Sequence, residues 1–256
     1  MTAFEWLTVV YFAGLGLSRA HRSRARGLLY AAGALLLVIV ARFTASWNVR
    51  VWLPHAYLML GYWIPAALTD GINERFERWL AAGWMPAARC GPLLHLLEVA
   101  YLLCYPLVPA AFAAVFLLGS DVDVARFWVA VLLAGYACYG SLPWTAARPP
   151  RLLGRAGRSD AEAPALIAAA NVYVLGRVSH NLNTFPSGHV AVSVAAALAL
   201  WPLSSVLSAA LLIVAAMIAA AAVAGRYHFA IDVALGMAVG AAAAAVALVV
   251  GRGAAA

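Results

Sequence analysis

The sequence predicts an all-α membrane protein, a polytopic bundle of about six to eight transmembrane helices. Of its 256 residues, 66% are hydrophobic and only 11% are charged, against roughly 45–50% and about 25% in soluble domains. A water-soluble fold cannot bury so much apolar surface, and a disordered chain is excluded for the same reason. Because a helix crosses a bilayer with about 20 apolar residues, the chain is long enough for several crossings.

Apolar runs between polar breaks place the helices in order along the chain. Residues 1–50 hold two accessory transmembrane helices, and residues 51–256 form the main membrane domain, with a six-helix core in the C-terminal two thirds. The expected helices cover residues 3–18, 28–45, 51–69, 93–118, 126–144, 188–203, 206–224 and 229–250.

Two polar interruptions separate these runs. Residues 70–91 set charged side chains against large aromatic ones, which predicts a helix lying in the membrane interface. Residues 145–187 form the longest interruption, where Ser159 and Glu162 make a capping box that predicts a short helix. In the last run, the small residues Gly236 and Gly240 are typical of close helix packing.

The charge distribution bears on orientation and on partners. The formal net charge is +7, and all 17 basic residues are Arg. Four of them lie in residues 19–26, which favours a cytoplasmic position for that loop. If every later run is a full crossing, residues 145–187 lie on the same side. We expect a multi-pass protein of the cell (inner) membrane with membrane lipids around it and no nucleic-acid partner, and the sequence predicts no oligomeric state.

Three clusters of ionisable residues lie beside the predicted helices, where such groups are costly and therefore functional candidates. Two crossings separate the second cluster from the third, and a loop joins the first to the second, so all three should meet at one membrane face. The clusters are Arg148-Pro149-Pro150-Arg151, Phe185-Pro186-Ser187-Gly188-His189, and Arg226-Tyr227-His228 with Asp232.

The residue types in these clusters suit phosphate chemistry. His228 and Asp232 share a helix face, so the carboxylate can accept one ring proton and leave the other nitrogen as a nucleophile or base. His189 would be a second acid–base group that protonates a leaving oxygen. Ser187 and Gly188, at the start of a helix, would bind phosphate through hydrogen-bond donors. The planar guanidinium groups of three arginines would bind the phosphate oxygens in pairs, namely Arg148, Arg151 and Arg226.

Together the clusters resemble the three-part signature of the phosphatidic acid phosphatase type 2 superfamily over roughly residues 93–250. Pro-Ser-Gly-His at 186–189 matches the second motif of that family, and His-x3-Asp matches the third. The resemblance implies that His228 attacks phosphorus and forms a phosphohistidine, that Asp232 orients it, and that His189 protonates the leaving group. It implies no metal and no cofactor.

Two positions depart from the family pattern. Ser141 stands where the first motif usually has Lys, and Ala222 stands where the third usually has Arg, so Arg226 is the candidate substitute. The Pro-Pro-Arg run is more similar to the branch that contains inositol phosphorylceramide synthases, in which Arg151 would be the first-motif Arg. The acceptor of the phosphoryl group, water or an alcohol, therefore stays open.

We accordingly expect a lipid phosphatase that removes phosphate from a lipid monoester or diphosphate. Candidate substrates are phosphatidic acid, phosphatidylglycerol phosphate and polyprenyl diphosphate. The alternative is a phosphotransferase that passes a phospho-headgroup to an alcohol. A non-enzymatic anion transporter would spread its polar residues through the membrane depth, whereas here they cluster at one face. The resemblance favours the extracytoplasmic side for that face.

Other polar residues have simpler interpretations. His95 and Glu98 are expected to form a buried polar pair. Asp121 and Asp123, one helix away from the first cluster, are expected in a solvated loop on the opposite face. Three residues before the second motif either satisfy loop backbone groups or touch the substrate, namely His180, Asn181 and Asn183.

Overall fold

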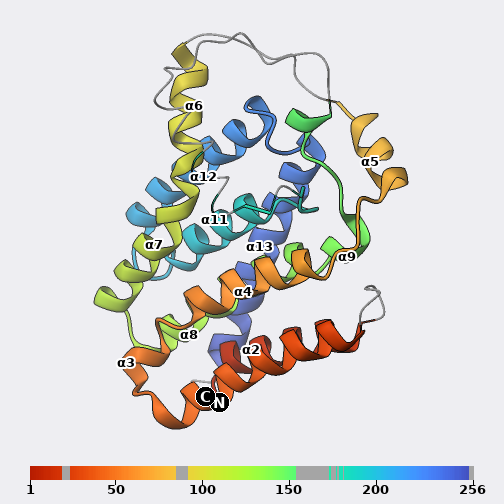
Figure 1. The fold of residues 1–256 in the computed structure, drawn as a ribbon. Coiled ribbons are helices and arrows are strands. Elements are labelled where there is room, and N and C mark those ends of the chain that lie inside the picture. The colour runs from red at the N-terminus through yellow and green to blue at the C-terminus, as the bar shows by residue number, and fades with distance from the viewer. Residues whose placement is uncertain are drawn as a thin grey trace.

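The computed structural model describes residues 1–18, 24–84, 92–153, 173, 177, 179–180 and 182–253. This part is helical except for loops and one isolated bridge between Ala147 and Asn183, which confirms the all-α fold (Figure 1). The helices are α1 (Ala3–Leu17), α2 (Arg24–Thr44), α3 (Trp47–Arg50), α4 (Pro54–Ala67), α5 (Glu74–Ala81), α6 (Pro92–Leu102), α7 (Cys104–Leu118), α8 (Asp121–Tyr139), α9 (Leu142–Thr145), η1 (Pro150–Leu152), α11 (Gly188–Ala199), α12 (Ser205–Ala224) and α13 (Ala230–Gly253).

Within the described part, four helices are long and apolar enough to cross a membrane, or five if one bent pair forms a single span. Large apolar side chains such as Phe43, Leu117 and Val206 are more than three quarters exposed, as expected for a surface that faces lipid. The chain is therefore a multi-pass membrane bundle, and the expected count of six to eight spans stays a prediction. The spans are Arg24–Thr44, Asp121–Thr145, Ser205–Ala224 and Ala230–Val250, with the pair Leu96–Leu102 and Cys104–Leu118.

The bent pair corrects the expectation of one continuous helix over 93–118. Helices α6 and α7 meet at Leu103 with a bend of 53°. Pro106 explains the break, because proline has no N–H to donate and its ring clashes with the carbonyl of the fourth residue before it, here Leu102. On either side of the bend, α6 packs against α12 and α7 packs against α11.

Helix α8 starts five residues earlier than expected, and this corrects the assignment of Asp121 and Asp123 to a solvated loop. Both lie in the first turn of α8, where Ser120 and Asp123 form a capping box. Asp121 accepts a hydrogen bond of 2.8 Å from the Trp47 indole, and Asp123 pairs with Arg126 at 3.0 Å. These carboxylates cap and anchor a helix, because acidic groups stabilise the positive end of its dipole.

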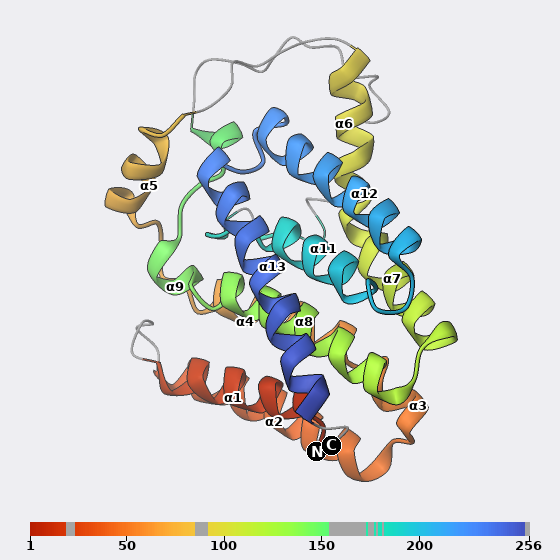
Figure 2. The same cartoon turned by 180° about the vertical axis from the view of Figure 1, so that it is seen from behind.

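The short helix α11 lies at the centre of the bundle, surrounded by α7, α8, α12 and α13 (Figures 1 and 2). Most of its residues are apolar and buried, as expected for a helix inside a bundle, and its twelve residues span only about 18 Å. Gly236 and Gly240 let α13 approach it closely, since a Cβ at Gly236 would lie 2.7 Å from the Ser187 carbonyl oxygen. The small-residue pattern therefore serves helix packing, as predicted.

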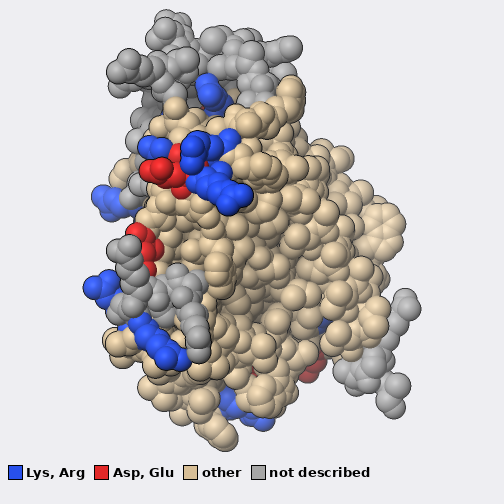
Figure 3. Space-filling model, turned by 90° about the vertical axis from the view of Figure 1, so that its right-hand side faces the viewer, with Lys and Arg blue, Asp and Glu red and all other residues tan. Residues whose placement is uncertain are grey.

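One end of the bundle gathers α5, α9, the end of α1 and the start of α2 (Figures 1 and 2). Figure 3 looks onto this end, where charged side chains of both signs gather beside a wide uncharged surface. The N-terminal end of α11 and the first turn of α13 point toward the same end. The capping box predicted at Ser159 and Glu162 lies outside the described residues.

Candidate active site

The three ionisable clusters meet at this end of the bundle, held together by their own backbones. The Arg151 N–H donates to the Arg226 carbonyl at 3.1 Å, which joins the first cluster to the third. The Ser187 N–H donates to the Asp232 carbonyl at 3.0 Å, which joins the second cluster to the third. The convergence predicted from helix order is thus present in the structure.

Asp232 lies behind the site and is fully buried. Its Oδ2 accepts hydrogen bonds from the Asn183 amide at 2.7 Å and from the Phe229 N–H at 3.0 Å. The same oxygen lies 3.5 Å from Nδ1 of His228, one helical turn before it. Two fixed donors thus hold the carboxylate beside the imidazole, and Nδ1 of His228 itself has no hydrogen-bond partner among the described residues.

His228 and His189 face each other across a small polar pocket. Their ring centroids are 6.1 Å apart, and both rings line the pocket together with Arg151. The free volume of the pocket is about 20 Å³, enough for a water-sized group, so a phosphoryl group enters only if the surrounding side chains move. Three tyrosines from different parts of the chain complete the walls, Tyr62, Tyr101 and Tyr227.

Several buried polar atoms around this pocket have no hydrogen-bond partner among the described residues. They include Oδ1 of both Asn183 and Asp232, Oγ of Ser187, and Nδ1 of His189. Most buried polar atoms in native proteins are hydrogen-bonded. A group of them at one place is therefore the pattern expected where a polar ligand completes the hydrogen bonding.

Arg151 is held over the pocket by an aromatic support. Its guanidinium carbon lies 4.9 Å from the centroid of the Tyr227 ring, a cation–π distance. Tyr227 stacks on Tyr101 at 4.0 Å and donates its hydroxyl to Glu98 at 2.6 Å. Burial of Tyr227, together with that carboxylate, raises the pKa of its phenol. Glu98 therefore bonds to Tyr227, and the side chain of its expected partner, His95, lies outside the described residues.

Arg148 is only three residues away but is paired elsewhere. Its guanidinium contacts both carboxylate oxygens of Glu77, at 2.6 and 3.0 Å, and its N–H donates to the same carboxylate at 2.8 Å. The hydrogen bonds from Arg148 lower the pKa of Glu77. Arg148 does not line the polar pocket, so its predicted contact with phosphate would require it to leave Glu77.

Glu77 belongs to α5, the short helix predicted between residues 70 and 91. Leu80 of α5 is buried against Ala147 and Phe229, and the ring of Phe76 lies 5.0 Å from that of Phe185. These partners come from the segments that carry the first, third and second clusters. Helix α5 thus packs against all three clusters and fixes them relative to one another.

The remaining predicted residues, Ser187, Gly188 and Arg226, do not line the polar pocket. Ser187 is the N-cap residue of α11, makes no side-chain capping hydrogen bond and is fully buried. Gly188 packs against the Tyr139 ring, where a Cβ would collide. Arg226 has a positive φ of 57°, a conformation that is strained for a residue with a side chain. It follows Gly225, the C-cap of α12, in the turn that leads to His228 and α13.

No motif in the sequence indicates the site residues contributed by α4 and α6. Tyr62 lines the pocket and stacks on His180 at 4.2 Å, and burial lowers the pKa of His180 to about 4. Asn183 was expected either to satisfy loop backbone groups or to touch the substrate, and its amide instead donates to Asp232. For Tyr227, the only indication in the sequence was its position between Arg226 and His228 in the third cluster. Asn181 lies outside the described residues.

A family model described as the PAP2 superfamily matches residues 124–254, just over half of the chain. The matched span runs from α8 to α13 and includes all three clusters. No curated protein and no solved structure matched the chain. Tyr62, Glu77 and Tyr101 lie outside the matched span, so those site contacts come from the part of this chain before it.

Proposed function

Because the chain belongs to the PAP2 superfamily, whose members are phosphatases or phosphotransferases, we propose that it is a phosphatase of lipid phosphate monoesters or diphosphates. The observation that carries this proposal is the pair of facing imidazoles beside Arg151, with Asp232 fixed behind His228. A site at a membrane interface accepts a charged headgroup while the chains stay in the apolar part of the bundle or bilayer.

In the first step, Nε2 of His228 attacks phosphorus while Nδ1 faces Asp232. The N–P bond forms, the P–O bond to the leaving group breaks (an ester bond in a monoester, the anhydride bond in a diphosphate), and His189 gives a proton to the leaving oxygen. The 3.5 Å between Nδ1 and the carboxylate is long for a hydrogen bond, and such contacts commonly shorten when substrate binds. Arg151 lies where it can neutralise charge on the phosphoryl oxygens.

In the second step, water attacks the phosphohistidine. His189, now neutral, accepts the proton of that water, the N–P bond breaks, and inorganic phosphate leaves. The Ser187 hydroxyl has no hydrogen-bond partner among the described residues, but it is fully buried and does not line the pocket, so it becomes a further donor only if the pocket opens toward it. Catalysis thus uses protein groups alone in this proposal.

The test is phosphate release from mixed lipid phosphates by detergent-purified protein and by His228→Ala and Asp232→Asn. Removing the nucleophile should abolish turnover, and removing the carboxylate should lower kcat by about 10⁴-fold. Asp121→Asn is the matched control, since it makes the same change at the opposite end of the bundle. Equal release from the wild type and His228→Ala would refute the proposed role of His228.

A phosphotransferase is the second candidate, and one observation favours it. Arg151, not Arg148, lines the pocket, and Arg151 is the first-motif Arg in the comparison with inositol phosphorylceramide synthases. An alcohol acceptor would then replace water in the second step. Absence of phosphate release from lipid alone, with transfer once an alcohol is added, would establish this activity in place of hydrolysis.

Two further expectations accompany the proposal. The mechanism uses no metal, so chelators should leave the activity intact, and loss of activity in EDTA with recovery in magnesium would contradict it.

The family resemblance places the end of the bundle that carries the site on the extracytoplasmic side, although the four arginines in residues 19–26 favour the cytoplasm. A single cysteine at exposed Arg75 of α5, probed with a membrane-impermeant thiol reagent in intact cells, decides the orientation, and labelling only after lysis would reverse it.

A further inference from the structure

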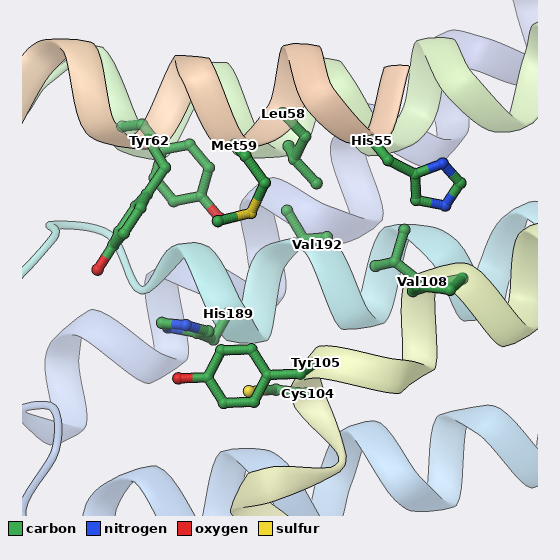
Figure 4. Close-up of a pocket in the computed structure, with 11 residues that line it drawn as sticks. His55, Leu58, Met59, Tyr62, Cys104, Tyr105, Val108, His189 and Val192 are labelled. Atoms are coloured by element: carbon green, nitrogen blue, oxygen red, sulfur yellow. The ribbon is translucent and has the colours of Figure 1, made fainter. Parts of the chain in front are cut away.

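Beside the polar pocket lies a second and larger space, the apolar chamber, between α4, α7, α8 and α11. Its volume is about 230 Å³. Figure 4 shows Tyr62 and His189 at one end and His55 at the other, with aliphatic side chains such as Val192 between them. The distance along α4 from Tyr62 to His55, seven residues, is about 10 Å. The chamber therefore extends from the site into the apolar depth of the bundle.

The chamber and the polar pocket share two walls, the side chains of Tyr62 and His189. His228 and Arg151 line only the polar pocket. His189 thus lies between the two spaces, with His228 and Arg151 on the side of the polar pocket and apolar side chains on the side of the chamber. If His189 protonates the leaving oxygen, as the proposed function holds, the leaving group attached to that oxygen lies at the mouth of the chamber.

The mouth also has polar atoms suited to a headgroup linkage. Tyr105 lies on α7 with its ring 6.0 Å from that of His189. Both Oη of Tyr105 and Nδ1 of His189 are buried and lack hydrogen-bond partners among the described residues. A phosphate ester oxygen at the mouth would satisfy such atoms, whereas the walls beyond them offer mainly apolar contact.

The volume limits what the chamber can hold. An apolar cavity of about 150 Å³ binds one benzene molecule, so 230 Å³ suits one hydrocarbon chain over several carbons and not two chains side by side. Pro109 of α7 is exposed and Met59 of α4 is half-buried. A longer chain can therefore leave between these helices and continue into the bilayer.

From this geometry we propose that the substrate is a single-chain lipid phosphate, an alkyl or isoprenyl phosphate or diphosphate, whose chain next to the leaving oxygen occupies the apolar chamber. This inference rests on the proposed function. A diacylglycerol phosphate carries two chains that diverge close to the phosphate, and the second would need a further chamber at the site. Two other hollows, one between α2 and α4 and one beside Met1, share no residue with the pocket or the chamber.

The experiment compares n-alkyl phosphates from ethyl to dodecyl, together with a short-chain phosphatidic acid of matched carbon content. The wild-type kcat/KM should rise by up to about fourfold per methylene and level off once the chamber is full. Met59→Trp and Val108→Phe, which fill the chamber from two helices, should stop that rise several methylenes earlier. The decyl-to-ethyl ratio of kcat/KM should fall at least about tenfold in each.

Leu117→Phe is the matched control, because Leu117 lies on the same helix as Val108 but is 78% exposed and should leave the profile unchanged. Micelle partitioning affects all variants alike, so a difference between their chain-length profiles reports on the chamber.

Hydrolysis of ethyl phosphate with a flat chain-length profile would overturn the chamber proposal and leave the proposed phosphatase function standing. Phosphatidic acid turned over as well as decyl phosphate would overturn the single-chain assignment. No reaction with any ester, with or without an alcohol acceptor, would remove the proposed function and this inference with it.

Discussion

Arg148 and Arg151 belong to one short segment, yet the structure places them in different surroundings. Arg151 lies over Tyr227 and lines the polar pocket with both imidazoles. Arg148 is bound by both oxygens of the Glu77 carboxylate on α5. We refer to the first arrangement as the pocket side and to the second as the α5 side. Arg151 faces the two imidazoles, whereas Arg148 binds α5 to the segment that carries both arginines.

The difference shows that a motif brings a residue near a site without fixing what it touches. Glu77 lies before the matched span, so no motif in that span indicates that a carboxylate occupies Arg148. Tyr101 and Glu98, which support Tyr227, also lie before it. The first half of the chain therefore decides which arginine of the first cluster is available to a phosphate.

The largest expected effect is on the pocket side, from Arg151→Ala. Loss of a preorganised cation beside the phosphoryl group should lower kcat by about 10²–10³-fold. Arg148→Ala is the matched change three residues away and should lower activity far less. An equal or greater loss in Arg148→Ala would mean that this side chain leaves Glu77 and binds substrate, and the distinction between the two sides would fail.

Next comes the aromatic support of Arg151. Tyr227→Leu removes the ring under the guanidinium and should raise KM roughly two- to thirtyfold, the range of cation–π energies. Tyr227→Phe keeps the ring and loses only the bond to Glu98, so it should retain most of the affinity. The comparison is made with steady-state kinetics at constant pH. Equal losses in both variants would show that the Glu98 bond positions Arg151 and that the ring does not.

On the α5 side, Glu77→Gln and Arg148→Ala should lower thermal stability with a small effect on activity. Their effects should not be additive, because each variant removes the same contact and the double variant loses nothing more. Thermal unfolding of the two single variants and the double variant measures this coupling. A double variant whose loss of Tm equals the sum of the single losses would show that the pair is not what holds α5 in place.

The last effects are those of pH on stability, which appear only in acid and in different pH windows for His180 and Glu77. Burial lowers the pKa of His180 to about 4, so between about pH 6.5 and 4 only the unfolded chain takes up the proton, and stability falls by up to about 1.4 kcal/mol per pH unit. The Arg148 hydrogen bonds lower the pKa of Glu77. Its contribution is therefore full above its unfolded value and is lost only as the pH falls through the lowered pKa.

Chemical denaturation across this range separates the two windows. His180→Gln should flatten the profile between about pH 6.5 and 4, where an unperturbed imidazole would titrate. Glu77→Gln should leave the shape of the profile unchanged between about pH 6.5 and 4. The difference in free energy of unfolding between Glu77→Gln and the wild type should become smaller only at lower pH. A His180→Gln profile identical to that of the wild type would mean that this imidazole is protonated in the folded protein as readily as in the unfolded chain.

Much of the fold could be predicted because lipid imposes a simple rule on composition. Apolar runs located nearly every long helix to within a few residues, and the close contact at Gly236 followed from the small-residue spacing. The errors arose where a local interaction outweighs hydropathy. Pro106 breaks the helix expected over 93–118, and the Ser120–Asp123 capping box starts α8 early.

The sequence by itself determined that this is a membrane bundle and that His189, His228 and Asp232 meet at one end, because helix order and the i, i+4 spacing leave little freedom. Only the tertiary structure decided what surrounds them. The Glu77 carboxylate, the Tyr227 ring and the Asn183 amide reach the site from segments whose spacing carries no signal. The apolar chamber beside His189 is walled by side chains of α4, α7, α8 and α11, and a cavity is a property of packing that no single segment encodes.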